Sequence, residues 1–325
     1  MTAAGPLRLL FCVDDRYLPQ AAVALSSVLE TAPGAEVEAT FAAFGRTPEL
    51  SEAVLAPTLA RHPGCTVRYR DLDESLVAGL PVTARFPRSI YARILLDRFM
   101  EPGDGRVLYL DADVVALADL RPLFQASLDG ATIGAVRDHF RLDPQTIGFG
   151  DAEPYFNSGV ILFDLLAWRE RQAEAHVLDV LAKEGKCFPW MDQDALNVAL
   201  RGQVRFLDLG WNFQPRCADV PAPFLALSGR KYRTMRARPR LIHYTTSLKP
   251  WAVPHRVHYS DRFFAAAARA GLSDRFPRPA ARGLSERIAA AKTRLRWSLP
   301  GAFRSVRTLL RPRAAARMYR SGAQA

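Results

Sequence analysis

Residues 106–115 read Arg-Val-Leu-Tyr-Leu-Asp-Ala-Asp-Val-Val, an apolar run that ends in two aspartates two positions apart. The apolar part, residues 106–110, has the composition of a buried strand. On extended backbone, residues two apart point to the same side, so Asp111 and Asp113 are expected to converge on one hard cation. Ligands of open α/β sheets bind at the carboxyl edge of the strands, which is where this pair would lie.

Taken alone, the aspartate pair leaves other interpretations open. An acidic pair at a strand end is about as often a helix cap or a solvated turn as a metal site. An apolar strand followed by Asp-x-Asp-x-Val is also similar to the signature of the haloacid dehalogenases, in which Asp111 would accept a phosphoryl group as nucleophile. The rest of the sequence has to decide among these possibilities.

Around this stretch, short apolar runs alternate with helix-patterned segments, which predicts an α/β fold with a mostly parallel sheet. The expected strands cover residues 7–13, 36–44, 66–69, 106–110, 132–136, 160–163 and 241–243. The expected helices cover residues 19–30, 165–183 and 192–200. Pro19 suits the first turn of the first helix.

Several further segments, in a fixed order along the chain, accompany the aspartate pair. They are Phe11-Cys-Val-Asp-Asp-Arg-Tyr17, Arg88-Ser-Ile-Tyr-Ala-Arg-Ile-Leu95, Tyr155-Phe-Asn-Ser-Gly-Val-Ile-Leu162, Asp192-Gln-Asp-Ala-Leu-Asn197 and His243-Tyr-Thr-Thr-Ser-Leu-Lys-Pro-Trp251. Together they resemble glycosyltransferase family 8 over roughly residues 7–255. The resemblance implies a GT-A fold, which is a Rossmann-like mixed sheet flanked by helices. It also implies retaining transfer of a hexose, galactose or glucose, from a UDP-sugar to a saccharide acceptor.

The resemblance implies that Asp111, Asp113 and His243 hold a divalent cation. The departing UDP gains negative charge as the sugar bond breaks, and a cation stabilises that charge as a Lewis acid. Two carboxylates, an imidazole and diphosphate oxygens suit Mn²⁺, with Mg²⁺ as the second choice. Lys249 would direct its ammonium to the same phosphates. Without the flanking motif, the alternative interpretation is that His243 is a core histidine at the end of a strand and Lys249 a solvated loop residue.

For the nucleotide, the resemblance places Asp14 at the uracil edge, Tyr17 against the nucleoside and Ala112 near the ribose. The alternative is that Asp14, Asp15 and Tyr17 only cap the helix that begins near Pro19. Two positions depart from the family pattern. Thr246 stands where a glycine usually lets the backbone approach the diphosphate, and Arg16 stands where an asparagine often contacts the ribose.

For the donor sugar, the resemblance implies a ring of polar side chains that bind the hydroxyl groups. Its members are Arg93, Asn157, Asp192, Gln193 and Asp194. Asp192 and Asp194 are also compatible with a helix cap and first turn. An amide is a poor nucleophile beside a carboxylate, so we expect same-face attack of the acceptor, with Gln193 stabilising positive charge at the anomeric carbon.

The net charge is +11, but residues 280–325 carry eleven Arg and Lys and one acid, which leaves +1 for residues 1–279. We therefore expect a GT-A domain over 1–279 and a basic, amphipathic segment over 280–325 that associates with an anionic membrane. The alternative for this tail is a solvated, disordered segment. The near-neutral body gives no indication of nucleic-acid binding.

The scattered cysteines have no metal-ligand spacing and are expected to be reduced thiols, which favours the cytoplasm. The sequence contains no apolar run long enough to cross a bilayer. We therefore expect a peripheral protein at the inner face of the cytoplasmic membrane, with lipopolysaccharide or another glycolipid as acceptor. Besides the dehalogenase-like phosphatase, a catalytically silent protein that binds the membrane surface remains as an alternative.

Overall fold

The computed structural model describes residues 5–83, 87–141, 143–150, 153–253, 257–279 and 288. A seven-stranded sheet with the order β3-β2-β1-β4-β7-β6-β8 forms its centre, and β5 pairs with β9 in a small second sheet. The strands are β1 Leu7–Cys12, β2 Val37–Ala43, β3 Cys65–Asp71, β4 Arg106–Leu110, β5 Val114–Ala116, β6 Ile133–Arg137, β7 Phe156–Asp164, β8 Val204–Phe206 and β9 Leu241–His243.

The central sheet is mixed. Strands β3, β2, β1 and β4 run parallel, whereas β7 is antiparallel to both of its neighbours, β4 and β6. The carboxyl ends of β1, β4 and β6 therefore meet at the same edge of the sheet, where β7 begins. This edge collects Cys12, Asp111, Asp138 and Asn157.

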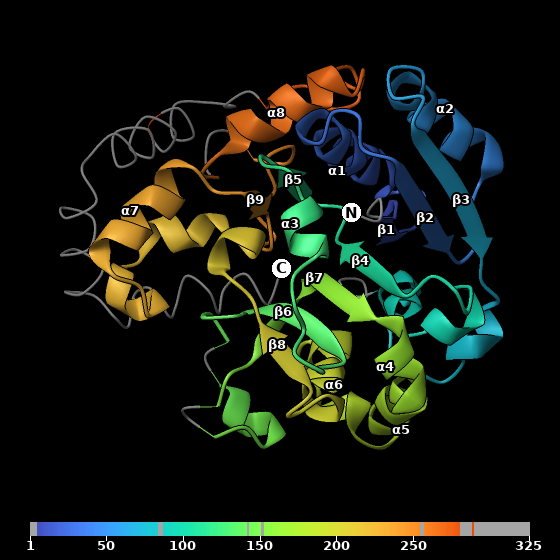
Figure 1. Cartoon of the computed structure of the whole chain (residues 1–325), viewed down its shortest axis with the longest axis vertical. Helices are drawn as coiled ribbons and strands as arrows, with labels where there is room; N and C mark the ends of the chain where they lie inside the picture. Colours follow the sequence, from blue (N-terminus) through green and yellow to red (C-terminus); the bar gives the residue numbers. More distant parts are fainter. Residues whose placement is uncertain are drawn as a thin grey trace.

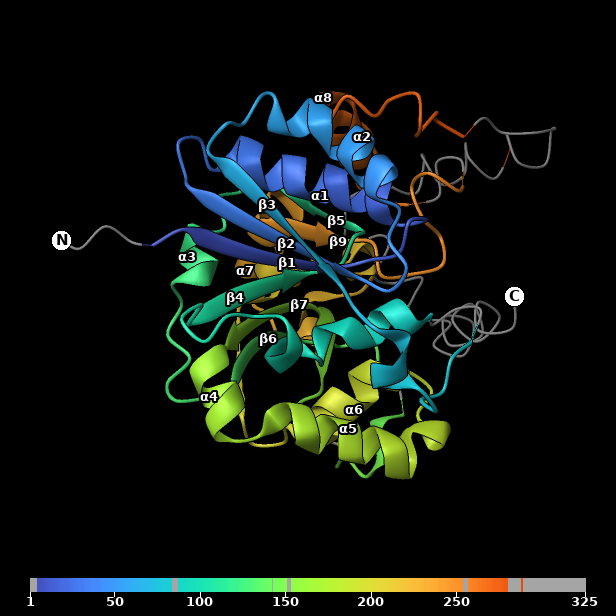
Figure 2. The ribbon, with the colours of Figure 1, turned by 90° about the vertical axis from the view of Figure 1, so that its right-hand side faces the viewer.

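Both faces of the sheet are buried, which explains why its central strands are apolar throughout. In β4, Leu108 and Leu110 face one core, while Val107 and Tyr109 face the other. Most of the helices lie on these two faces, as Figures 1 and 2 show, whereas α7 lies to one side of the sheet in Figure 1. The α-helices are α1 Leu18–Thr31, α2 Pro48–Leu59, α3 Arg121–Phe124, α4 Leu165–Glu170, α5 Ala173–Glu184, α6 Met191–Ala199, α7 Gly229–Ala237 and α8 Ser260–Arg269.

Helices α1, α2 and α8 cover one face of the sheet, and α4, α5 and α6 cover the other (Figure 2). Helix α1 is the most deeply placed, with eleven buried residues that include the apolar run from Ala21 to Leu25. The sequence correctly predicted an α/β fold with helices on both faces of the sheet.

The predicted strands all occur, with ends that differ by a few residues. The single helix expected over 165–183 was wrong. It is divided into α4 and α5 because Gln172 adopts a left-handed conformation with φ 52°. The expected extended backbone was also wrong at Asp113, which lies with Ala112 in the turn that joins β4 to β5.

The small second sheet is the element that completes the site. In it, β5 and β9 pair antiparallel, with Val114 opposite His243. This register places His243, which lies 130 residues beyond Asp113 in sequence, next to the turn that carries the two aspartates. Backbone bonds secure the arrangement, because the Tyr244 N–H donates to the Asp113 carbonyl oxygen at 3.0 Å.

Within the described residues, no helix combines the length and apolar character that crossing a membrane requires. The basic segment over 280–325 lies outside the described residues apart from residue 288.

Candidate active site

Asp111, Asp113 and His243 form one cluster at the carboxyl edge of the sheet. His243 Nε2 lies 3.3 Å from Asp111 Oδ2 and 3.2 Å from Asp113 Oδ1. One ligand atom from each residue lies within 4.8 Å of the others. The structure therefore brings together the three side chains that the sequence analysis assigned to a metal.

Gly159, near the start of β7, provides the space for this cluster. Its carbonyl oxygen accepts a hydrogen bond from the Asp111 N–H at 2.8 Å, so the two backbones are in close contact. A Cβ atom at position 159 would lie 2.1 Å from His243 Cε1 and 2.5 Å from Asp111 Oδ2. Both distances are far below van der Waals contact, so only glycine fits here without moving the ligands.

We expect Gly159→Ala to displace His243 and Asp111 and to weaken the binding of a divalent cation by about 10- to 100-fold, as loss of ligand orientation does elsewhere. Overpacking should also lower the free energy of unfolding by about 1–3 kcal/mol. Mn²⁺ titration and urea unfolding measure the two effects. Gly103→Ala is the matched control, because a Cβ there meets nothing within 4 Å. Equal Mn²⁺ affinity in both variants would contradict the prediction.

Asn212 fixes the orientation of the His243 ring. It lies at the end of the 3₁₀-helix η6 (Leu209–Asn212), and its Oδ1 accepts from His243 Nδ1 at 2.8 Å. The Asn212 Nδ2 donates to Asn157 Oδ1 at 2.9 Å, which identifies the oxygen side of the Asn212 amide. His243 Nε2 is thereby directed at the two aspartates, the arrangement typical of a metal-binding histidine.

The electrostatics of the cluster favour ionised carboxylates. Burial works against charge at Asp111, but Arg93 and His243 outweigh it and hold the pKa of Asp111 well below its usual range. Burial likewise opposes charge at Asp113, where Lys249 and His243 lower the pKa. At His243, burial is outweighed by Asp113 and Asp111, which raise its pKa to about 9.

This donor set fits a divalent cation. It offers two ionised carboxylates and an imidazole whose Nδ1 is already engaged, and the proton on Nε2 has to leave when the nitrogen becomes a ligand. Lys249 supplies positive charge at the same place, because its ammonium donates to Asp113 and, at 2.6 Å, to the Tyr244 carbonyl oxygen. The Lys249 ammonium thus lies beside the metal-ligand candidates.

A chain of amides connects the cluster to Gln193 in α6. From Asn212, the chain continues through Asn157, whose Nδ2 donates to Gln193 Oε1 at 3.0 Å. Gln193 Oε1 also accepts from the Ser158 N–H at 3.0 Å, so the oxygen side of the Gln193 amide is fixed too. His243, Asn212, Asn157 and Gln193 therefore form one connected network of hydrogen bonds.

Arg93 connects the cluster to Asp192. It is 6% exposed, and its Nη1 lies 3.0 Å from Asp111 Oδ1 while its Nε lies 3.4 Å from Asp192 Oδ2. The guanidinium also lies 4.4 Å from the centre of the Tyr109 ring. Arg93 belongs to the 3₁₀-helix η2 (Arg88–Arg93), which lies within one of the segments that carry the family resemblance.

Asp192 is 4% exposed. Burial, opposed by Arg93 and reinforced by Asp111, raises its pKa to about 6. Asp194, which is fully buried, accepts from the Tyr155 hydroxyl at 2.6 Å and the Trp190 N–H at 2.8 Å. The two carboxylates therefore differ, since both oxygens of Asp194 are bonded to the protein whereas Asp192 pairs with Arg93.

Because the pKa of Asp192 is raised to about 6 in the folded protein, protonation of Asp192 stabilises the fold. This contribution to the free energy of unfolding is complete below the unfolded-state pKa of the carboxyl group and is lost as pH rises through about 6. We expect Asp192→Asn to gain stability relative to the wild type by up to about 3 kcal/mol between about pH 4 and about pH 7.5. Urea unfolding at the two pH values measures this, with Asp274→Asn on the exposed surface as control. A constant difference between variant and wild type would contradict it.

The expected nucleotide residues occupy the turn after β1 and the neighbouring loops. Asp14 accepts from the Arg16 and Tyr17 N–H groups at 3.1 and 3.2 Å and pairs with the Arg16 guanidinium at 2.7 Å. Asp14 thus makes the local turn contacts that the sequence analysis weighed as the alternative. Tyr17 is 39% exposed, Ala112 lies between the two aspartates, and the Thr246 hydroxyl donates to the Leu248 carbonyl oxygen at 3.3 Å.

Sequence reasoning missed several residues of this site. Asp138 follows β6 at the same sheet edge, and its Oδ2 accepts from Asn157 Nδ2 at 3.4 Å. The rule that identified Asp111, an acid after an apolar strand, would also have identified Asp138. Ser158 and Gly159 lay inside a segment already singled out, but without a role. For Asn212 the sequence offered no comparable signal.

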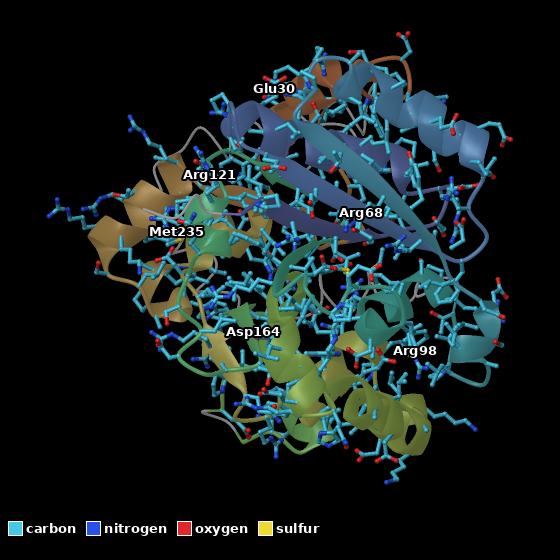
Figure 3. All side chains as sticks on the ribbon, turned by 45° about the vertical axis from the view of Figure 1, so that its right-hand side comes forward. Glu30, Arg68, Arg98, Arg121, Asp164 and Met235 are labelled. Carbon is cyan, nitrogen blue, oxygen red and sulfur yellow. The ribbon has the colours of Figure 1, made fainter. Side chains whose placement is uncertain are left out.

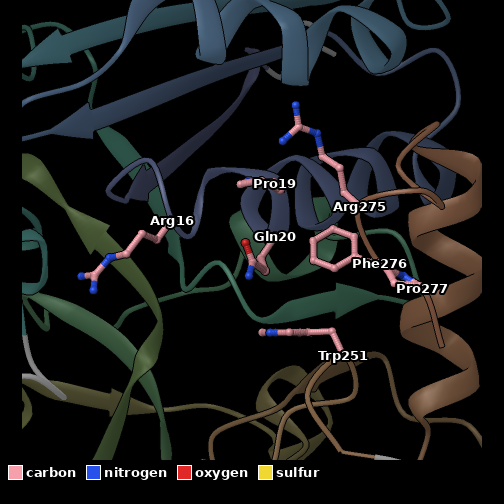
Figure 4. Close-up of a pocket in the computed structure, with 7 residues that line it drawn as sticks. All are labelled: Arg16, Pro19, Gln20, Trp251, Arg275, Phe276 and Pro277. Atoms are coloured by element: carbon pink, nitrogen blue, oxygen red, sulfur yellow. The ribbon is translucent and has the colours of Figure 1, made fainter. Parts of the chain in front are cut away.

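A pocket of about 400 Å³ lies beside the turn after β1 (Figure 4). It is lined by Arg16, Pro19, Gln20, Trp251, Arg275, Phe276 and Pro277. Arg16 extends away from the paired rings of Trp251 and Phe276 in this view. The pocket contains none of the cluster residues, so it is a separate hollow near the start of α1.

The chain is similar to known glycosyltransferases. The lipopolysaccharide 1,2-glucosyltransferase of Escherichia coli K12 is 30% identical over 177 residues, which cover 53% of this chain and 52% of that protein. The match thus spans about half the length of this relative. The galactosyltransferase LgtC, solved in complex with donor and acceptor sugar analogues, is 28% identical with a TM-score of 0.69, covering 81% of this chain and 95% of LgtC.

A second LgtC structure is that of an active-site mutant in which a glutamine is replaced by glutamate. It is 27% identical to this chain, with a TM-score of 0.69 and the same coverage of both chains.

The family match covers most of the chain. The family described as Glycosyl transferase family 8 matches residues 8–253, which include β1, the aspartate pair, the amide network and His243. This removes the haloacid dehalogenase interpretation of the aspartate pair. The chain belongs to glycosyl transferase family 8 and has its GT-A fold.

Proposed function

We propose that this member of the family transfers a hexose, galactose or glucose, from a UDP-sugar to a saccharide acceptor with retention of configuration. One observation carries the proposal. The cluster of Asp111, Asp113 and His243 is joined through Asn212 and Asn157 to Gln193. A group that binds a diphosphate and a group that contacts the sugar would thus lie side by side.

Asp111, Asp113 and His243 would hold Mn²⁺, or Mg²⁺ as second choice. When bound, such a cation neutralises the charge that develops on the leaving diphosphate. Lys249 adds a second positive charge at this place, and its side chain would transfer from Asp113 to a phosphate oxygen. Arg93 keeps Asp111 ionised and oriented, because it lies 3.0 Å from the Asp111 carboxylate.

Asp14, Tyr17, Ala112 and Thr246 would bind the nucleotide. Asp14 has to exchange its contact with Arg16 for the uracil edge, since the Arg16 guanidinium lies 2.7 Å from its carboxylate in this structure. Arg16 is then free to turn toward the phosphates. The exposed position of Tyr17 suits stacking against a nucleoside.

Arg93, Asn157, Asp192, Gln193 and Asp194 would bind and orient the donor sugar. We propose same-face attack by the acceptor, with Gln193 stabilising positive charge at the anomeric carbon and the leaving phosphate accepting the acceptor's proton. The active-site glutamine of LgtC supports a role for Gln193. Asp194 would act mainly by holding α6, since Tyr155 and Trp190 occupy its oxygens.

For the acceptor we propose lipopolysaccharide or another glycolipid. The support is that the similar E. coli protein is named a lipopolysaccharide 1,2-glucosyltransferase. We further propose that residues 1–279 form the catalytic domain and that the basic segment 280–325 associates with the inner face of the cytoplasmic membrane. Eleven cations in this segment support the membrane association.

A thermal-shift panel tests the donor class. UDP-galactose or UDP-glucose with Mn²⁺ is expected to raise the melting temperature by about 5 °C or more at saturation, while a phosphate monoester leaves it unchanged. UDP release that requires both Mn²⁺ and a saccharide acceptor would distinguish a transferase from a silent binding protein. Stabilisation by other nucleotide sugars but by neither UDP-hexose would reject the proposed donor.

A further inference from the structure

Helix α7 and the residues just after it form a strongly basic surface. Six cations and no acid occur over residues 230–240. These are Arg230, Lys231, Arg233, Arg236, Arg238 and Arg240, and with Phe224 they are here termed the α7 surface. All of them are exposed except Arg236, which is half-buried. Because residues 1–279 have a net charge of only +1, this charge is a local concentration and not a general property of the body.

Most of this charge has no counter-ion among the described residues. Asp208 pairs with Lys231 at 2.8 Å and with Arg240 at 3.8 Å. In the described structure, Arg230, Arg233 and Arg238 make no ion pair. In Figure 3, side chains that end in blue nitrogen atoms extend outward from the helix that carries the labelled Met235. A hollow of about 330 Å³ between Arg230, Lys231, Arg238, Arg240 and Asp208 adds space for an anionic group.

The α7 surface is held rigidly by its inner face. Tyr232 and Met235, three residues apart, are buried, so the helix presents its cations to solvent. The Tyr232 hydroxyl donates to the carbonyl oxygens of Val220 at 2.8 Å and Cys217 at 3.1 Å. The Tyr259 hydroxyl donates to the Arg236 carbonyl oxygen at 2.8 Å. An anionic partner would therefore meet a preformed array of charges.

An exposed aromatic ring accompanies the cations. Phe224 lies in the 3₁₀-helix η8 (Ala222–Leu225), which contacts α7, and is 44% exposed. Its ring centre lies 5.6 Å from that of Phe140, which comes two residues after Asp138. Asp138 in turn contacts Asn157, which belongs to the network of His243, Asn212, Asn157 and Gln193. The Phe224 end of the α7 surface therefore lies close to this network.

We propose that the α7 surface docks on an anionic lipid bilayer and brings the network around Gln193 to a lipid-borne acceptor. Arginines attract acidic headgroups, and a phenylalanine partitions into the boundary between headgroups and acyl chains. The presentation of the Gln193 network to a lipid-borne acceptor rests on the proposed function, whereas the docking of the α7 surface on the bilayer does not. The surface belongs to the described fold and precedes the segment 280–325 in the sequence.

Vesicle sedimentation of the full chain tests the docking. The α7 variant combines Arg230→Gln, Arg233→Gln and Arg238→Gln. It is expected to lower the partition coefficient of the protein onto phosphatidylglycerol vesicles by on the order of 100-fold. The control combines Arg61→Gln, Lys183→Gln and Lys186→Gln, which remove the same charge from exposed positions at the ends of α2 and α5. The control should lose less than about tenfold, and high salt should reduce the difference.

Equal partitioning of the α7 variant and the wild type overturns the proposal, as does an equal loss in the control. Wild-type binding to neutral phosphatidylcholine vesicles as strong as to phosphatidylglycerol vesicles overturns it too. Transfer to a soluble saccharide acceptor is measured on the same preparations and should be unchanged in both variants. If the wild type fails to transfer, the proposed function is rejected while the sedimentation result still decides the docking.

Discussion

Replacing Asp113 with asparagine is expected to lower Mn²⁺ affinity and Mn²⁺-dependent transfer by at least about 100-fold. Loss of a group that only orients a metal ligand costs about 10- to 100-fold, so loss of the ligand should cost at least the upper value. Asparagine has nearly the same shape but lacks the charge that His243 and Lys249 neutralise. Electron paramagnetic resonance of free Mn²⁺ measures binding independently of activity.

The matched comparison is a variant of Asn212, which contacts His243 but lies outside the cluster. Asn212→Ala removes the acceptor of His243 Nδ1 and should weaken Mn²⁺ binding by about 10- to 100-fold. Asn212→Asp keeps an acceptor for the ring and should retain more affinity than alanine. Wild-type Mn²⁺ affinity in Asp113→Asn would remove Asp113 from the metal site, and equal affinity in the two Asn212 variants would reject the orienting role.

The central strands were predictable because their residues carry the signal locally. Residues 106–110 and 241–243 are apolar runs with distinct ends, and the observed strands β4 and β9 have these same bounds. The division between α4 and α5 was not predictable in this way. It depends on one left-handed residue, Gln172, in a stretch that otherwise continues a helical pattern.

The site was predictable where one segment carries several of its residues. Asp111 and Asp113 were found from a strand end, but their convergence arises from a turn and from the pairing of β5 with β9. That pairing is a contact across more than a hundred residues, which no local pattern specifies. The roles of Gly159 and Asn212 depend on the same packing, since each acts through its distance from His243.

The basic α7 surface was not predicted from the sequence, for a related reason. A net charge of +1 over residues 1–279 suggested a neutral body. Many acidic side chains within residues 1–279 form ion pairs with basic side chains elsewhere, such as Asp138 with Arg216 and Glu174 with Arg98. The cations of α7 are mostly left without such partners among the described residues. An average over the chain therefore cannot detect a local basic surface.

Gln193→Ala is expected to lower kcat by about 100- to 1000-fold with a much smaller change in KM for the donor. This is the usual cost of removing one group that stabilises charge in the transition state. The amide lies at the end of the network that begins at His243, so its position relative to the cluster of Asp111, Asp113 and His243 is fixed. Steady-state transfer assays at saturating Mn²⁺ measure both constants.

Alanine also leaves the Ser158 N–H and the Asn157 Nδ2 without their acceptor, which would cost about 1–3 kcal/mol of stability for each buried donor. Gln193→Glu separates the two effects, because a carboxylate accepts from the same donors. If Gln193 only holds Asn157 and Ser158 in place, glutamate should restore kcat to near the wild-type value. If the Gln193 amide itself acts on the sugar, glutamate should restore stability but not turnover. An alanine variant with wild-type kcat would remove Gln193 from the mechanism.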